Sequence, residues 1–281
     1  MESGDPLVTA EWLKDHISAP DVRVVDATWF PPFLNMKKTG RQAWAESHIP
    51  GSVYFDIDAI KAGGTDLPHM LPDPVMFSSR VRKLGLGDGN RIIVYDQFNF
   101  FASARVWWML RVMGQRDVKV LDGGLRAWTE AGGEIEDLPP VPVERHFTAR
   151  VRSDLLKDAE QMLAASKSGL HTIIDSRSAE RFSGEAPEPR EGLPSGHIPG
   201  SVCLPSDKLR TPAGKMKSAE ELAKLFPTPP AATIATCGSG VSAAVTALAL
   251  ARLGNWDVAV YDGSWTEWAS DESRPIATGP A

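Results

Sequence analysis

A six-residue stretch decides the fold because it occurs twice, as His48-Ile49-Pro50-Gly51-Ser52-Val53 and as His197-Ile198-Pro199-Gly200-Ser201-Val202. The same spacing separates two further matching segments, Val24-Val25-Asp26 and Ile173-Ile174-Asp175. Similar segments that recur at a fixed spacing and in the same order indicate an internal repeat. The sequence therefore predicts a tandem duplication of one domain.

A third pair of segments extends the repeat, since residues 122–128 and 262–268 both begin with Asp-Gly and end with Trp. Between the two halves lies Leu138-Pro139-Pro140-Val141-Pro142. This stretch can continue neither a helix nor an inner strand, because proline lacks the backbone N–H. We predict a first domain over residues 1–137, a proline-rich linker over 138–150 and a second domain over 151–281.

Each half alternates short strands with helices. The strand segments are rich in β-branched residues, as strands buried in a parallel sheet are. They are residues 22–26, 92–96 and 118–121, and in the second half 172–175, 233–236 and 258–261. Helical patterns follow at 102–112 and 241–253, ended by Gly114 and Gly254. The alternation predicts two α/β domains, each a mainly parallel sheet with helices on both faces.

The composition excludes several classes of function. With 30 Lys and Arg against 36 Asp and Glu, the chain lacks the basic surplus that a nucleic-acid backbone requires. No apolar run approaches the ~20 residues that span a bilayer, and the acidic opening residues are unlike a secretory signal. Two cysteines are typical of a reducing compartment, and the scattered histidines show no metal-ligand spacing. We expect a cytoplasmic monomer without a bound metal.

The two halves differ at one chemically decisive position. The first-half strand ends at Asp96, whereas its counterpart ends at Cys237, followed by Gly238-Ser239-Gly240-Val241-Ser242. Open parallel sheets place their ligands at the carboxyl ends of strands. Glycines allow backbone N–H groups to converge on one point, and the following helix N-terminus favours the thiolate. We predict a catalytic second domain with Cys237 as nucleophile and an inactive first copy.

These features resemble the rhodanese superfamily of sulfurtransferases over nearly the whole chain. The resemblance rests on the repeated His-Ile-Pro-Gly element, on segments 122–128 and 262–268, and on loop 237–242. It implies that Cys237 takes sulfur from a donor as a persulfide and passes it to a small thiol, a thioredoxin-type protein or cyanide, with no cofactor. Thiosulfate-preferring members carry basic residues after the cysteine. Gly238 and Ser239 instead resemble the branch that uses 3-mercaptopyruvate, although Ser242 stands where threonine is more usual.

A second segment carries the candidate carboxylate-binding residues. Arg181 and Arg190 match the two arginines of the family's substrate-binding segment, and their guanidinium forks suit a carboxylate beside a carbonyl. The other candidate contacts to the donor come from the loop after the nucleophile. These are Gly238, Gly240, Val241 and Ser242.

Proton transfer to the departing enolate needs a general acid or base. Ser239 lies two residues after Cys237. From the first half, Asp58 and His69 match positions that the resemblance assigns to a Ser/His/Asp relay. Lys215-Met216 is the second-half counterpart of His69-Met70, so the histidine is not part of the repeated pattern. A role in the fold alone therefore does not explain His69.

Three other functions compete with this interpretation. A cysteine phosphatase would need an arginine six residues after the cysteine, and Ala243 stands there. A thiosulfate sulfurtransferase would share the fold and the persulfide. Only the uncharged loop and the arginine pair of this sequence separate the two activities. A non-enzymatic binding module would be indicated by loss of Cys237, which is present. His48 and His197 occur in both halves and are interpreted as turn-stabilising residues.

Overall fold

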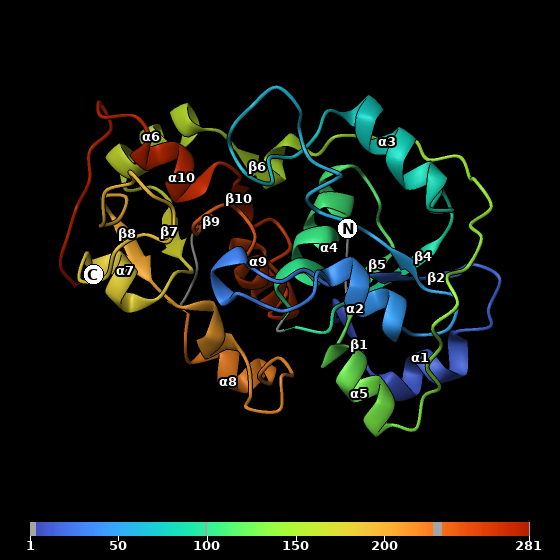
Figure 1. The fold of residues 1–281 in the computed structure, drawn as a ribbon. Helices are drawn as coiled ribbons and strands as arrows, with labels where there is room; N and C mark the ends of the chain where they lie inside the picture. Colours follow the sequence, from blue (N-terminus) through green and yellow to red (C-terminus); the bar gives the residue numbers. More distant parts are fainter. Residues whose placement is uncertain (1–3, 99, 227–231, 281) are drawn as a thin grey trace. The chain divides into compact units, whose positions relative to one another are not determined.

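The structure is a computed structural model that describes residues 4–98, 100–226 and 232–280. By their internal contacts the residues form two compact units (Figure 1). The first consists of Met1–Gly63, Leu71–Arg152 and Pro212–Met216, and the second of Gly64–Met70, Ser153–Thr211 and Lys217–Ala281. Each unit contains one parallel sheet of five strands.

The sheet of the first unit has the spatial order β1-β5-β4-β2-β3. Its strands are β1 (Leu7–Val8), β2 (Val22–Asp26), β3 (Val53–Tyr54), β4 (Arg91–Tyr95) and β5 (Val118–Leu121). Its helices are α1 (Ala10–His16), α2 (Gly40–Glu46), α3 (Pro74–Lys83), α4 (Phe101–Val112) and α5 (Gly124–Glu130), with a 3-10 turn at Pro32–Leu34. Parallel neighbours require such helical crossovers.

The second unit repeats this order as β6-β10-β9-β7-β8. Its strands are β6 (Leu156–Lys157), β7 (Thr172–Asp175), β8 (Ser201–Cys203), β9 (Thr233–Thr236) and β10 (Ala259–Tyr261). Its helices are α6 (Ala159–Ser168), α7 (Ala179–Ser183), α8 (Ala219–Ala223), α9 (Ala243–Arg252) and α10 (Ser264–Ala269), with 3-10 turns at Ser153–Leu155 and Ser206–Leu209. The predicted duplication is therefore also present in the topology.

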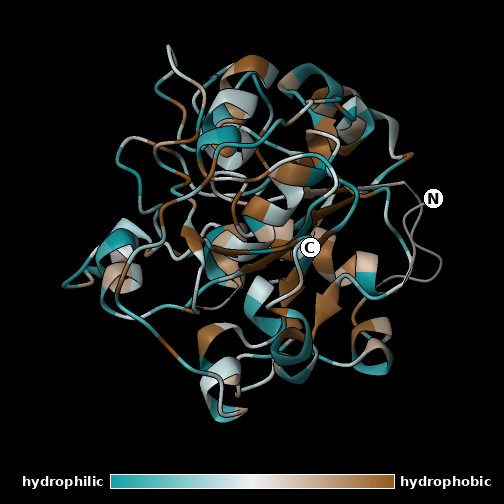
Figure 2. Cartoon of the chain, turned by 90° about the vertical axis from the view of Figure 1, so that its right-hand side faces the viewer, coloured by the Kyte–Doolittle hydropathy of each residue, from teal (hydrophilic) through white to brown (hydrophobic). Residues whose placement is uncertain are grey.

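Helices cover both faces of each sheet. In the second unit, α6 and α10 lie together on one face, where Met162 and Trp268 pack against Ile173 and Ile234, while α9 contacts the strands from the other side (Figure 1). The strands in the interior are brown in Figure 2, as are parts of several helices. In the first unit α1 and α5 share a core around Trp128, and α4 packs on β4 and β5. The predicted fold class is confirmed.

The observed element boundaries differ slightly from those predicted. The helix after Cys237 begins at Ala243 rather than Val241, because residues 241 and 242 form a turn. Strand β4 ends at Tyr95, so Asp96 lies just beyond it. The predicted linker, residues 138–150, contains neither helix nor strand. These shifts move no residue to another element.

Two short segments belong to the opposite unit from the rest of their half. Gly64–Met70 belongs to the second unit, and Pro212–Met216 to the first, where the Met216 N–H donates to Asp122 Oδ1 (2.9 Å). The sequence repeat already pairs His69-Met70 with Lys215-Met216. The exchange is therefore a property of the duplicated fold.

The repeated histidines hold equivalent turns in both units. His48 exchanges backbone hydrogen bonds with Glu136, and His197 does the same with Ala277. Both side chains are buried, and each Nδ1 lies within hydrogen-bond distance of a backbone carbonyl, Trp44 O (2.7 Å) or Phe182 O (2.9 Å). Their contacts are structural, in agreement with their presence in both halves.

Candidate active site

Cys237 lies at the carboxyl end of β9, at the start of the loop that leads into α9. The residue is 2% exposed, and the neighbouring Ser239 is also buried. Gly240 has φ +74°, which L side chains rarely adopt, so glycine is required there. The loop thus presents a buried thiol at the sheet edge where open α/β folds bind ligands.

Ser264, at the start of α10, anchors this loop. Its Oγ accepts hydrogen bonds from the N–H groups of Cys237 (3.2 Å) and Gly240 (3.0 Å), and lies 4.0 Å from the Cys237 sulfur. Its φ is +50°, a strained value for a residue other than glycine. Sequence reasoning missed Ser264, although the repeat gives a signal, because its first-half counterpart is Gly124, also at positive φ.

The two predicted arginines lie together over Gly238. A Cβ at Gly238 would be 3.2 Å from Arg181 Nη2 and 3.7 Å from Arg190 Nη1. Burial lowers the pKa of the Arg190 guanidinium from its usual value, while the charge of Cys237 opposes that shift. Arginine nevertheless stays protonated in proteins. The structure therefore brings both guanidinium groups to the first loop residue after Cys237.

A buried carboxylate holds Arg181 in this position. Glu188, whose side chain is 1% exposed, accepts from Arg181 Nε (3.1 Å) and Nη2 (2.5 Å). Glu188 also accepts from Arg177 Nη1 (2.9 Å). Arg177 binds Asp175 through Nε and Nη2 and stacks over Trp265. Sequence reasoning missed Glu188 and Arg177, whose only signal is the alternation of charges along the segment.

The first unit shows what the same loop does with a carboxylate in place of the thiol. Asp96 is buried, and its Oδ1 accepts from the N–H groups of Phe98 (3.0 Å) and Phe100 (3.2 Å). Its Oδ2 accepts from the Ser103 N–H (2.9 Å). Burial raises the pKa of Asp96 to about 6, against these hydrogen bonds, which lower it. The strand–loop–helix turn of this fold is thus an anion cradle, filled here by its own side chain.

This burial predicts a pH-dependent difference in stability between the protein and its Asp96→Asn variant. The folded protein binds the Asp96 proton more tightly than the unfolded chain does, since the pKa rises from 3.8 to about 6. Stability relative to the variant should therefore fall by about 2 kcal/mol as the pH rises from 4 to 7. Denaturant unfolding of both proteins across this range measures the difference. Parallel stability curves would contradict the assignment.

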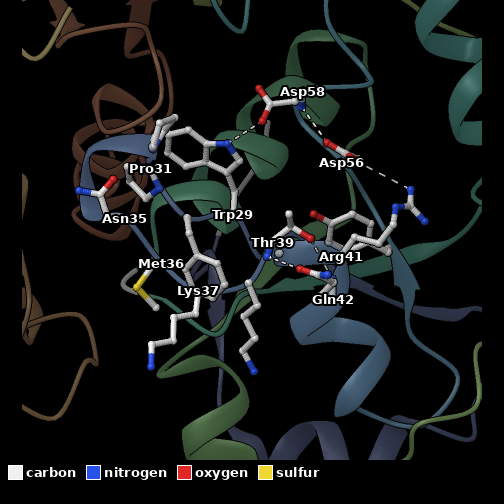
Figure 3. Close-up of a pocket in the computed structure, with 15 residues that line it drawn as sticks. Trp29, Pro31, Asn35, Met36, Lys37, Thr39, Arg41, Gln42, Asp56 and Asp58 are labelled. Atoms are coloured by element: carbon white, nitrogen blue, oxygen red, sulfur yellow. Dashed lines mark hydrogen bonds and ion pairs between the residues drawn. The ribbon is translucent and has the colours of Figure 1, made fainter.

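The structure places the two first-half relay residues in different units. His69 belongs to the second unit, with Cys237, and is buried with φ +60°. Asp58 belongs to the first unit, is exposed, and accepts a hydrogen bond from Trp29 Nε1 (2.8 Å) (Figure 3). It lines a cavity of about 630 Å³. A strained, buried histidine in the same unit as Cys237 is consistent with a functional role.

The other cysteine, Cys203, lies at the end of β8. Burial raises the pKa of Cys203 to about 11, with the charge of Asp175 acting in the same direction. Cys203 therefore stays a thiol at neutral pH, and thiols are poor nucleophiles. Among the described residues, no group of three or more His, Cys, Asp or Glu is placed to hold a metal ion. Within the same ranges, no helix is long and apolar enough to cross a membrane.

Two parallel sheets of identical strand order and a cysteine in the second strand–loop–helix turn define a duplicated rhodanese-like protein. The model of the rhodanese-like domain matches residues 9–131 and again 156–271. The chain belongs to the rhodanese family, as its sequence predicts.

Similar proteins carry two different activity names. The chain is 38% identical to the 3-mercaptopyruvate sulfurtransferase of Escherichia coli K12, with 96% of each chain covered. It is 39% identical to the thiosulfate sulfurtransferase of Bos taurus, over 93% of this chain and 91% of that one. The crystal structure of SseA, a 3-mercaptopyruvate sulfurtransferase from Escherichia coli, superimposes with a TM-score of 0.85 at 36% identity, covering 93% and 99% of the two chains. Overall similarity therefore supports sulfur transfer but does not separate the two donors.

Proposed function

We propose that this protein is a sulfurtransferase that takes sulfur from 3-mercaptopyruvate onto Cys237 and releases pyruvate. The observation that carries the choice of donor is the position of Arg181 and Arg190 over Gly238. Paired guanidinium groups bind a carboxylate and its adjacent carbonyl oxygen through charge-assisted hydrogen bonds. Gly238 leaves room for them, since any side chain there would approach Arg181 Nη2 closely.

The chemistry is a displacement at the donor's sulfur. The Cys237 thiolate forms an S–S bond while the C–S bond of 3-mercaptopyruvate breaks, and the bonding electrons pass to carbon as a pyruvate enolate. The new persulfide loses one proton, and the enolate gains one proton to become pyruvate. Arg181 and Arg190 hold the carboxylate and carbonyl, so they stabilise the enolate oxygen as its charge develops.

The proton route is proposed to pass through Ser239, with His69 and Asp58 as its further members. Ser239 is buried beside the nucleophile, and His69 belongs to the same unit. The remaining loop residues Gly240, Val241 and Ser242 are proposed to line the sulfur-binding side of the site. Asp58 is the member with least support, because it lies in the first unit and binds Trp29.

The acceptor and the cellular setting remain proposals. A small thiol, a thioredoxin-type protein or cyanide would take the persulfide sulfur, and we expect the protein to act as a cytoplasmic monomer. A relative can have another location, since a sulfurtransferase of Arabidopsis thaliana that is 36% identical is named mitochondrial.

A single-turnover experiment tests the function. Mixing the protein with 3-mercaptopyruvate in the absence of an acceptor should release one equivalent of pyruvate and add the mass of one sulfur atom to the peptide that contains Cys237. Cys203 should remain unmodified, because its raised pKa keeps it protonated. Pyruvate release without a modified Cys237 peptide would exclude the persulfide mechanism, and no reaction at all would favour a binding module.

A second candidate, thiosulfate:cyanide sulfurtransferase, is favoured by the named activity of the Bos taurus relative. It would use the same cysteine and the same persulfide. The absence of a basic side chain at Gly238 and Ser239 argues against it, because thiosulfate is a dianion.

A further inference from the structure

A chain of charged side chains leads from Asp175 to Gly238, the residue after Cys237. Asp175 binds Arg177, Arg177 and Arg181 share Glu188, and Arg181 Nη2 lies 3.2 Å from the position of a Gly238 Cβ. Among the described residues no carboxylate forms an ion pair with Arg190, although Glu188 acts on it at longer range. Three guanidinium groups and two carboxylates leave these five side chains one positive charge, beside which the Cys237 thiolate of the proposed mechanism carries one negative charge.

We infer that Glu188 sets the donor specificity of the site by lowering the positive charge that faces the donor, which disfavours a dianionic donor more than a monoanionic one. This inference rests on the proposed function. At neutral pH 3-mercaptopyruvate carries one negative charge on its carboxylate, whereas thiosulfate carries two. Because Glu188 is 1% exposed, solvent screens its charge poorly, and it acts on any anion bound by Arg181 and Arg190.

Glu188 also positions Arg181, so its two roles must be separated. A displaced Arg181 would weaken the binding of both donors, and Glu188→Asp measures the effect of that displacement on the ratio of their kcat/KM values while the negative charge is kept. A change in charge does not cancel in this ratio, because the interaction with a dianion changes by about twice as much as that with a monoanion. A rise of the ratio of kcat/KM for thiosulfate to kcat/KM for 3-mercaptopyruvate in Glu188→Gln, beyond any rise in Glu188→Asp, therefore reports the charge.

The test compares two substitutions of Glu188. Glu188→Gln removes the charge with little change of size, and should raise the ratio about tenfold or more, mainly through a lower KM for thiosulfate. Glu188→Asp keeps the charge on a shorter side chain, and should lower kcat/KM for both donors while leaving the ratio unchanged. Glu185→Gln removes an exposed charge from the same segment, and should change the ratio less than about twofold.

An unchanged ratio in a folded Glu188→Gln protein would overturn the inference, and so would an equal rise in Glu188→Asp. If thermal melting shows that Glu188→Gln does not fold, Gly238→Lys adds a positive charge with Glu188 in place and should move the ratio in the same direction; a constant ratio would again overturn it. Failure of the proposed function looks different, since the unsubstituted protein would then itself prefer thiosulfate.

Discussion

Replacing Cys237 by serine is expected to lower kcat for pyruvate release from 3-mercaptopyruvate by at least about 10³-fold. A serine hydroxyl at the end of β9 is a much weaker nucleophile than a thiolate, and it cannot carry the transferred sulfur as a persulfide. The first unit cannot replace the lost group, because Asp96 fills its own cradle with three backbone hydrogen bonds. The loss should be independent of the sulfur donor.

Cys203→Ser is the matched control for this substitution. It removes the chain's other thiol, which lies at the end of β8 and has a pKa of about 11. We expect kcat to stay within about twofold of the original protein, because a protonated thiol contributes no nucleophile. Equal losses in the two variants, or substantial activity in Cys237→Ser, would remove Cys237 from the mechanism.

Arg190→Ala is expected to lower kcat/KM for 3-mercaptopyruvate by about ten- to hundredfold, the loss of about 1.5–3 kcal/mol of charge-assisted hydrogen bonding. The effect should exceed that of Arg181→Ala, because Glu188 forms a direct ion pair with Arg181 and acts on Arg190 only at longer range. Arg190→Lys keeps the charge without the planar fork, so its kcat/KM should lie between those of the unsubstituted protein and Arg190→Ala.

Steady-state kinetics with the three arginine variants checks this order. A larger loss in Arg181→Ala than in Arg190→Ala would show that Glu188 does not offset Arg181. An unchanged kcat/KM in Arg190→Ala would mean that the donor's carboxylate binds elsewhere. Circular dichroism should show that each variant keeps the fold of the parent.

The repeat made the fold predictable before any coordinates were known. His48 and His197, spaced like the paired strands around them, implied two copies of one topology, and the sheets have the same strand order. Apolar strand patterns fix which segments are buried, so the predicted strands shifted by at most one residue. The start of α9 was less predictable, since Val241 and Ser242 continue the apolar pattern but form a turn.

The site was predictable only where residue type and sequence position carry the chemistry. Cys237 stands out because its copy is Asp96, and the arginines stand out as a pair. Glu188 and Ser264 depend on which distant side chain they meet, Arg181 in one case and the Gly240 N–H in the other. Such contacts follow from tertiary packing, which local pattern does not encode. The placement of Gly64–Met70 in the second unit likewise follows from tertiary packing.

Steady-state kinetics with 3-mercaptopyruvate and with thiosulfate, each with cyanide as acceptor, tests the central claim most directly. We expect a kcat/KM at least about tenfold higher for 3-mercaptopyruvate, the effect of one mismatched charge near the arginines. An equal or higher kcat/KM for thiosulfate would contradict the assignment of donor, while leaving the fold and the nucleophile as they are.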